Sequence, residues 1–200
     1  MFLAICLVGA GYLLGSVSSA ILVCRWLGLG DPRTAGSGNP GATNVLRVGG
    51  KKAAALTLCG DVLKGVLPVL AAHLVSGQPA VVAATALAAF LGHLYPVFFG
   101  FKGGKGVATA IGVITAMTWK VAAAMVLTWL FMALVFRYSS LSALTAALLA
   151  PAYTAFLAPD NSYIAAVAAM SLFLFWRHRS NIRKLLAGTE DKIGARRQNA

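Results

Sequence analysis

Three short segments of the sequence combine glycine with basic or amide side chains, a composition suited to holding phosphate. The first runs from Gly36 to Asn44 and is followed closely by Arg47. Successive glycines allow positive φ angles, so consecutive N–H groups can form a concave nest for an anion. Arg47 adds a planar fork of permanent charge that matches phosphate, although an ordinary flexible loop can share this composition. The candidate residues here are Gly36, Ser37, Gly38, Asn39, Thr43, Asn44 and Arg47.

The second segment lies between two apolar runs and extends from His93 to Thr109. It carries Gly103, Gly104 and Lys105 just before an apolar run that we expect to be helical. Free N–H groups and the positive end of the dipole make a helix N-terminus a ready site for phosphate. The competing interpretation is a turn whose lysines extend towards water. His93 fits either a satisfied core histidine or a residue of the site.

The third segment extends from Arg177 to Glu190 and follows the last apolar run directly. His178 and Asn181 are spaced i, i+3, so a helix would place both on one face near the end of that run. Both side chains can donate hydrogen bonds to a phosphate or to a developing oxyanion. The other basic residues of the segment fit an interfacial helix whose charges contact lipid head groups.

Two charged residues, Asp61 and Lys64, fall inside the second apolar run. Ionisable side chains within a membrane-spanning helix are costly and by default indicate function. Their i, i+3 spacing also permits an ion pair that would only anchor the helices. The sequence leaves both interpretations open.

Several common motifs of phosphate and acyl-transfer chemistry are absent. A Walker loop requires a glycine five residues before Gly104 and a hydroxyl residue after Lys105, where Phe99 and Gly106 stand. No histidine is followed five residues later by aspartate, the pattern of the common glycerolipid acyltransferases. Only 5 Asp and Glu residues occur, too few for a two-metal site, so we expect neither a metal nor a cofactor.

The composition places these segments in a membrane protein. The chain is 59% hydrophobic and 11% charged, against roughly 25% charged in soluble domains. The net charge of +12 would suit nucleic acid or an anionic membrane surface, and the apolar content favours the membrane. No second type of composition appears, so we expect one domain over residues 1–200 and no nucleic-acid partner.

Seven apolar runs predict an all-α bundle of about seven transmembrane helices. The first three runs reach the length of about 20 residues that a crossing needs. The run at 107–118 is the shortest, and a re-entrant half-helix competes with a full crossing there. The runs are Phe2–Val23, Ala53–Val75, Ala80–Phe99, Val107–Thr118, Val121–Phe136, Leu141–Leu157 and Tyr163–Phe175.

The positive charges between the runs orient the predicted helices. With the N-terminus outside and seven crossings, 15 of the 17 Lys and Arg residues fall on the cytoplasmic side. With six crossings, Arg137 and the basic C-terminal tail would move outside. We therefore expect seven crossings, a cytoplasmic C-terminus, and all three segments at the cytoplasmic face.

The segments Gly36–Asn44, Gly103–Thr109 and His178–Arg183 resemble the three signature segments of the bacterial acyl-phosphate:glycerol-3-phosphate acyltransferases. The likeness covers essentially the whole chain in order, spacing and hydropathy. It implies a seven-span enzyme of the bacterial inner membrane with its site near the cytoplasmic face. The implied reaction passes a fatty acyl group from acyl phosphate to the 1-hydroxyl of sn-glycerol 3-phosphate. Its products would be lysophosphatidic acid and inorganic phosphate, which opens phospholipid synthesis.

The resemblance also implies site residues and partners. Asp61 and Lys64 match an Asp-x-x-Lys-Gly segment of the family and are further candidates. His93 is a candidate from its place in the second segment alone. The implied partners are acyl phosphate, glycerol 3-phosphate, membrane lipids and the enzyme that makes acyl phosphate. The residues placed in the site are Ser37, Lys105, His178 and Asn181 as catalytic residues, and Gly36, Gly38, Asn39, Thr43, Asn44, Arg47, Gly103 and Gly104 as phosphate-binding residues.

The chemistry of this reaction fits the residues independently. Two phosphorylated substrates need two anion pockets and no metal. Acyl phosphate is an activated anhydride, so positioning and charge stabilisation suffice for direct attack by the hydroxyl. We expect Lys105 and Arg47 to clamp phosphates, and Ser37, Asn181 and His178 to donate hydrogen bonds. A small anion transporter is the alternative function, although no inverted repeat is visible.

Overall fold

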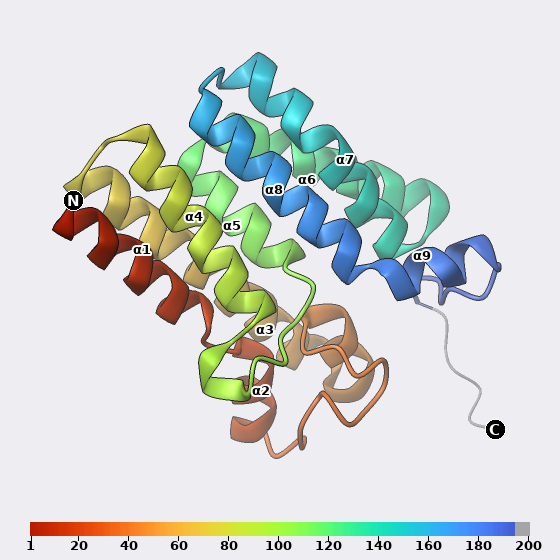
Figure 1. Cartoon of the computed structure of the whole chain (residues 1–200). Coiled ribbons are helices and arrows are strands. Elements are labelled where there is room, and N and C mark those ends of the chain that lie inside the picture. The colour runs from red at the N-terminus through yellow and green to blue at the C-terminus, as the bar shows by residue number, and fades with distance from the viewer. Residues whose placement is uncertain (195–200) are drawn as a thin grey trace.

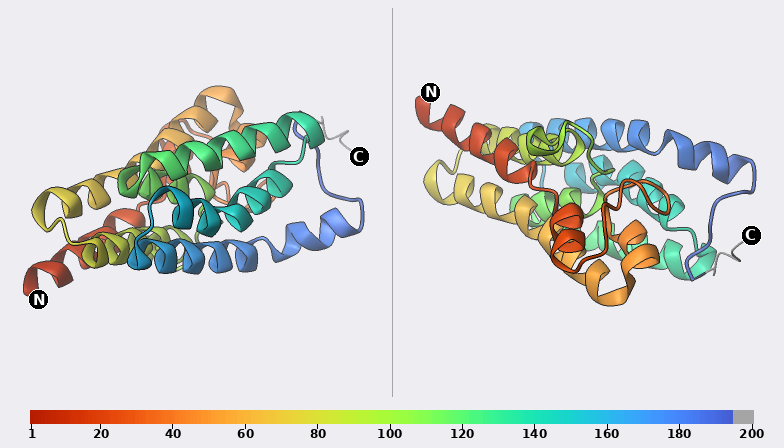
Figure 2. Two further views of the ribbon diagram at one scale, coloured as in Figure 1. Left: turned by 90° about the horizontal axis from the view of Figure 1, so that it is seen from above. Right: turned by 90° about the horizontal axis from the view of Figure 1, so that it is seen from below.

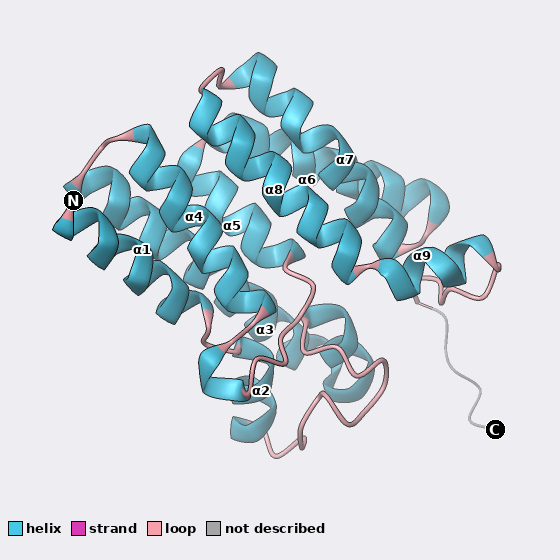
Figure 3. Ribbon diagram, in the orientation of Figure 1, coloured by secondary structure: helices cyan, strands magenta, loops and turns pink. Residues whose placement is uncertain are grey.

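The structure of the chain is a computed structural model that describes residues 1–194. Every regular element among these residues is helical, as expected for an all-α protein (Figure 3). The long helices lie side by side in one bundle (Figures 1 and 2). Arg196 and Arg197, two members of the predicted basic tail, lie outside the described residues.

The first apolar run is broken into two helices. Helix α1 (Phe2–Gly15) and helix α2 (Ser19–Trp26) are bent by 42° at the break between them. In this break, the Nζ of Lys64 donates to the carbonyl oxygen of Val17 at 2.8 Å. The contact satisfies a backbone acceptor that a continuous helix would have paired internally. The expectation of one continuous helix over Phe2–Val23 was therefore wrong.

Helix α3 (Ala42–Val75) begins well before the predicted run Ala53–Val75. It bends at Gly50, whose φ of 77° is open to glycine and strained for other residues. The turns before this bend carry many polar residues, so hydropathy alone left them in a loop. As a result, Asn44 and Arg47 stand on the first turns of a helix, where their side chains have fixed directions.

Helix α4 (Pro79–Leu94) ends just before Pro96, whose ring cannot continue it. A short 3-10 turn, η1 (Val97–Phe99), and an extended loop then lead to helix α5 (Val107–Met117). The predicted run Ala80–Phe99 therefore extended beyond the end of the helix.

The C-terminal half consists of four further helices. Asp160 caps the helix that follows it by accepting from the N–H groups of Ser162 and Tyr163 at 2.8 and 3.1 Å. Only His178 separates the last two helices, so the chain turns at this residue. The four helices are α6 (Trp119–Phe136), α7 (Ser139–Leu157), α8 (Asn161–Arg177) and α9 (Arg179–Leu186).

The chain is a polytopic membrane helix bundle. Within residues 1–194, 4 helical stretches are long and apolar enough to cross a membrane, and the bent pair of α1 and α2 would make a fifth. Helix α5 has 11 residues, a rise of about 17 Å against a hydrocarbon core of about 30 Å. All seven predicted apolar runs nevertheless coincide with helices.

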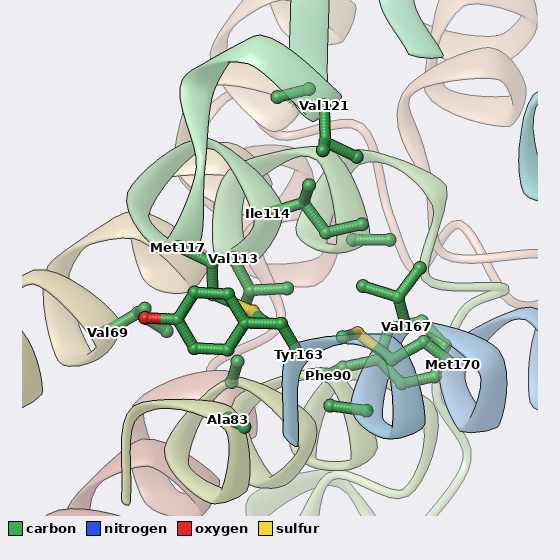
Figure 4. Close-up of a cluster of buried hydrophobic side chains, with 14 of the residues drawn as sticks. Val69, Ala83, Phe90, Val113, Ile114, Met117, Val121, Tyr163, Val167 and Met170 are labelled. Carbon is green, nitrogen blue, oxygen red and sulfur yellow. The ribbon is translucent and has the colours of Figure 1, made fainter. Parts of the chain in front are cut away.

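Helix α5 occupies the centre of the bundle, in contact with α3, α4, α6 and α8. Figure 4 shows its residues Val113 and Ile114 in the buried cluster that also contains Phe90 of α4. Small residues let the backbones meet, since a Cβ on Gly112 would overlap the carbonyl of Val62 in α3. Glycine therefore allows α5 to pack closely against α3 at this point.

Candidate functional site

The three predicted segments lie at one end of the bundle (Figure 1). The loops α2–α3 and α4–α5 gather there with the α8–α9 junction and the turn between α6 and α7. The N-terminus and the connections α3–α4 and α7–α8 lie at the opposite end. The fold therefore brings together segments that are far apart in the sequence.

Asn44 organises the first segment from within. Its Nδ2 donates to the carbonyl oxygens of Pro32 and Ala35 at 2.8 and 3.0 Å. Its Oδ1 accepts from the N–H of Ser37 at 2.7 Å, and the residue is 1% exposed. Both amide hydrogens are thus used within the loop, which leaves no donor for a phosphate. The expectation that Asn44 binds phosphate directly is corrected: this residue shapes the loop.

Part of the backbone of the same loop is also paired with itself. The N–H groups of Gly38 and Gly41 donate to the carbonyl oxygens of Ala35 and Asn39 at 3.0 and 2.9 Å. Gly36 and Gly38 have the predicted positive φ angles, 61° and 70°. The N–H groups of Gly38 and Gly41 are therefore not free for an anion, and ligand binding by this loop would depend on its remaining N–H groups and on side chains.

The other polar residues of the first segment are more open. Ser37 and Thr43 are exposed, and the Thr43 hydroxyl lies 3.5 Å from the Ser139 hydroxyl at the start of α7. Arg47 extends from α3 to the C-terminal segment, where its Nη1 lies 3.1 Å from Oδ2 of Asp191. The carboxylate of Asp191 thus contacts the guanidinium of Arg47, which we expected to bind a phosphate.

Replacing Asn44 with alanine is expected to destabilise the protein by about 3 kcal/mol, because one N–H and two carbonyl oxygens lose their partners. Thermal unfolding in detergent and limited proteolysis within the α2–α3 loop would measure the effect. Asn39→Ala is the matched control, since the Asn39 amide makes no hydrogen bond within residues 1–194. Equal unfolding midpoints and cleavage rates for the two variants would contradict the role given to Asn44.

The glycine pair of the second segment packs against the end of α4. The N–H of Gly104 donates to the carbonyl oxygen of His93 at 3.2 Å. A Cβ on Gly104 would overlap the His93 imidazole, and a Cβ on Gly103 would overlap the His93 carbonyl. The Cβ position of Gly104 is also 3.2 Å from the carbonyl oxygen of Pro40 in the first segment. Glycine is required at both positions, and the N–H of Gly104 is already paired.

Lys105 joins the second segment to the third. Its Nζ donates to Oδ1 of Asn181 at 2.6 Å. Burial lowers the pKa of this amine to about 8, and the positive charges of Lys184 and Arg47 act in the same direction. The carboxylate of Glu190 opposes them. An ammonium group held among other cations favours the arrival of an anion.

His178 stands at the junction of α8 and α9 and is 3% exposed. Its Nδ1 lies 2.9 Å from the carbonyl oxygen of Leu174, which can only accept, so Nδ1 carries a proton. Burial first, and the charge of Lys105 second, lower the pKa of this imidazole to about 4, so the ring is neutral near pH 7. Its Nε2 therefore carries a lone pair. In this tautomer the free nitrogen of His178 can accept a hydrogen bond, whereas the sequence led us to expect a donor.

Glu190 belongs to the site, although the sequence pattern did not single it out. Its Oε1 accepts from the hydroxyl of Ser140 at 2.6 Å and from Nδ2 of Asn181 at 2.7 Å. Asn181 is therefore held at both ends of its amide, by Glu190 and by Lys105. The scarcity of acidic residues was the available signal, since Glu190 is one of only 5 in the chain.

Arg177 is a second residue that the sequence pattern did not assign to the site. Its Nε and Nη2 donate to the carbonyl oxygens of Gly104 and Gly103 at 3.0 and 2.7 Å. The guanidinium carbon lies 5.7 Å from the centre of the Tyr95 ring. In the sequence, Arg177 is only one of several arginines after the last apolar run, so its partners were not predictable.

The ion pair that the i, i+3 spacing permits in α3 is present and buried. Nζ of Lys64 lies 2.8 Å from Oδ1 of Asp61, and the two residues are 8% and 2% exposed. Nδ1 of His93 lies 3.6 Å from the same carboxylate oxygen. Because His93 also supports Gly104, the three side chains form a buried charged cluster that underlies the glycine pair.

The chemical character of this end of the bundle is that of an anion site. Within residues 1–194, no three His, Cys, Asp or Glu side chains lie close enough together to hold a metal ion. The ammonium of Lys105 bonds to the amide of Asn181, and its charge acts on the neutral imidazole of His178. The charge of Arg47 in turn acts on Lys105. Cations and amides suit phosphate oxygens, and an unprotonated Nε2 suits a hydroxyl group. The arrangement can hold phosphate groups and orient an alcohol.

Sequence relatives agree with this chemistry. The model of the family described as glycerol-3-phosphate acyltransferase matches residues 5–188. The glycerol-3-phosphate acyltransferase of Thioalkalivibrio sulfidiphilus (strain HL-EbGR7) is 58% identical over 199 residues, covering 100% of this chain and 98% of that protein. That of Hydrogenovibrio crunogenus (strain DSM 25203 / XCL-2) is 56% identical over 187 residues, covering 93% and 90%.

Two crystal structures of PlsY (YgiH), an integral membrane glycerol 3-phosphate acyltransferase, share the fold. The glycerol 3-phosphate form superposes with a TM-score of 0.92 at 43% identity and covers 96% of both chains. The lysophosphatidic acid form gives a TM-score of 0.89 at 42% identity, with 96% of this chain and 95% of that chain covered.

Proposed function

The chain belongs to the glycerol-3-phosphate acyltransferase family and is a membrane enzyme that forms lysophosphatidic acid, and we propose that acyl phosphate is its acyl donor. The acyl group passes to the 1-hydroxyl of sn-glycerol 3-phosphate, and inorganic phosphate leaves. The observation that carries this proposal is the ammonium of Lys105 held on the amide of Asn181, with Arg47 near enough for its charge to lower the pKa of that amine. Two phosphorylated substrates need two cationic anchors, and a transport function has no support from the family.

The proposed reaction is a direct transfer. The hydroxyl oxygen of glycerol 3-phosphate attacks the acyl carbon, and the bond from that carbon to the phosphate oxygen breaks. Phosphate leaves with the electron pair of that bond. Because the donor is already activated, the site contributes position and charge stabilisation rather than a covalent intermediate.

The phosphate groups are held by side chains from all three segments. Lys105 and Arg47 neutralise phosphate oxygens, and Arg47 exchanges its contact with Asp191 for the phosphate. The neutral donors are Ser37, Asn39 and Thr43 of the first segment together with Asn181. The glycines Gly36, Gly38, Gly103 and Gly104 give the two loops their shape.

His178 orients the attacking hydroxyl. Because Nδ1 is committed to Leu174, the lone pair at Nε2 accepts the hydrogen bond from the 1-hydroxyl. A pKa of about 4 makes this imidazole a weak base, so the proton moves to His178 or to a substrate phosphate only as the new bond forms.

The pH dependence of kcat/KM for glycerol 3-phosphate is expected to follow the ionisation of the Lys105 amine. Burial lowers the pKa of Lys105 to about 8, so the amine of the free enzyme loses its charge above that pH. A neutral amine attracts phosphate weakly, and kcat/KM should fall about tenfold for each pH unit above 8. Bound phosphate stabilises the charged form, so kcat at saturation should fall only at higher pH.

Lys105→Arg is the matched variant for this pH profile, because a guanidinium remains charged throughout the range. Its residual activity should lack the alkaline decline that the wild type shows. The same decline in both enzymes would contradict the assignment to Lys105.

The direct transfer is tested by rapid quenching of the purified enzyme with acyl phosphate labelled in the acyl chain. On this proposal no label becomes bound to protein, with or without glycerol 3-phosphate. Label that accumulates on the protein at the rate of phosphate release would overturn direct attack.

The proposed arrangement in the membrane is one domain over residues 1–200 with seven crossings, the N-terminus outside and the C-terminus in the cytoplasm. The charge pattern of the sequence supports it, because seven crossings with the N-terminus outside would place 15 of the 17 Lys and Arg residues on the cytoplasmic side. The short helices α5 and α8 then cross within the bundle. In this arrangement the site faces the bacterial cytoplasm.

A further inference from the structure

We propose that Arg177 is a positioning residue, whose guanidinium sets the orientation of two successive peptide groups in the loop that carries Lys105. The inference rests on the proposed function and adds a residue to it. It concerns a side chain that points at the backbone of the loop rather than at a substrate.

The first peptide group, between Gly103 and Gly104, is held at both ends. Its carbonyl oxygen accepts from Nη2 of Arg177 at 2.7 Å, and its N–H donates to the carbonyl oxygen of His93 at 3.2 Å. A peptide group fixed on both sides cannot rotate without losing a hydrogen bond. It therefore cannot offer its N–H to a phosphate, and it serves as the anchor of the loop.

The second peptide group, between Gly104 and Lys105, is held by the same side chain. Its carbonyl oxygen accepts from Nε of Arg177 at 3.0 Å. In a planar trans peptide the N–H points opposite to the carbonyl, so the N–H of Lys105 points away from Arg177. The two hydrogen bonds from Arg177 thus fix the orientation of the Lys105 backbone. They also fix the direction in which the Lys105 side chain leaves the backbone towards Asn181.

The geometry requires an arginine. One planar guanidinium donates from two nitrogens to two successive carbonyls, whereas the single ammonium of a lysine is a compact point charge. The Tyr95 ring, 5.7 Å from the guanidinium carbon, limits the movement of the group further. Nε and Nη2 of Arg177 are both bonded to the loop, so these atoms do not bind phosphate. Arg177 therefore acts by positioning Lys105. Its place beside His178 also ties this loop to the third segment.

The test compares Arg177→Lys and Arg177→Ala with the wild type in purified, detergent-solubilised form. We expect kcat/KM for glycerol 3-phosphate to fall 10- to 100-fold in both variants. The loss should appear mainly in KM, because Lys105 keeps its charge but is no longer held in the right position. Free guanidinium ion in the assay should restore part of the activity of Arg177→Ala and none of that of Arg177→Lys. A purely structural role would not produce this selective rescue.

Arg179→Ala is the matched control. Arg179 lies two residues further on, is exposed, and contacts only Trp176 in the described part of the chain, so its removal should change kcat/KM less than twofold. Near-normal activity of Arg177→Lys would overturn the proposal, even if Arg177→Ala fails to fold. Loss of activity in a folded Arg177→Ala without guanidinium rescue would also overturn it. The wild type in the same assay distinguishes failure of the Arg177 proposal from failure of the proposed function. If the wild type makes no lysophosphatidic acid from acyl phosphate, the proposed function is wrong.

Discussion

Replacing Lys105 with methionine is expected to lower kcat/KM about 10³-fold, the size of effect seen when a preorganised charge donor is removed from a transition state. Methionine keeps the length and the apolar stem of lysine but removes the ammonium group that bonds to Asn181. The leaving phosphate and the bound glycerol 3-phosphate then lose the half-buried ammonium that the second segment supplies. Steady-state kinetics with each substrate varied in turn would measure the loss.

Lys102→Met is the control for this variant. Lys102 belongs to the same segment and carries the same charge, but its side chain is exposed. Its removal should change kcat/KM less than threefold, because exposed charges are screened by solvent and salt. Comparable losses in the two variants would show that the segment contributes only general positive charge.

Replacing His178 with alanine is expected to lower kcat about 10²-fold, because the acceptor that orients the attacking hydroxyl is lost. His178→Gln should retain part of the activity, since an amide can donate to the Leu174 carbonyl and still present an oxygen that accepts. Neither variant should alter the alkaline decline assigned to Lys105. Single-turnover measurements would separate this chemical step from product release.

His73→Ala provides the comparison for His178. His73 lies near the other end of α3, where its Nε2 is 3.5 Å from the hydroxyl of Tyr163. Its replacement should leave kcat within twofold of the wild type. If His178→Ala and His178→Gln both keep a near-normal kcat, His178 is neither a base nor an acceptor for the hydroxyl.

The sequence predicted the helices of the bundle well where apolar side chains defined them. It failed at the ends of helices, where polar turns carry no hydropathy signal. The first turns of α3 before Gly50 are one example. The break after Gly15 is another, because the Val17 carbonyl is satisfied by Lys64, a residue 47 positions away in the chain. Contacts of that kind depend on tertiary structure and leave no local pattern.

The sequence also predicted that three distant segments lie on one side of the bundle, and they gather at one end of it (Figure 1). It could not predict which side-chain donors would bind a ligand and which would bond to backbone carbonyls of the loops. Asn44 and Arg177 illustrate this limit, since both have the chemistry of a phosphate ligand and both instead hold loop carbonyls. In the same way, the hydrogen bond from Nδ1 to Leu174 turns His178 from an expected donor into an acceptor.

The most direct measurement is the stoichiometry of phosphate release by the purified enzyme. With acyl phosphate and glycerol 3-phosphate together, the account predicts one inorganic phosphate for each lysophosphatidic acid formed. With acyl phosphate alone, it predicts no release above the spontaneous rate, since no residue accepts the acyl group. Release of phosphate without glycerol 3-phosphate, or lysophosphatidic acid formed from a thioester donor but not from acyl phosphate, would contradict it.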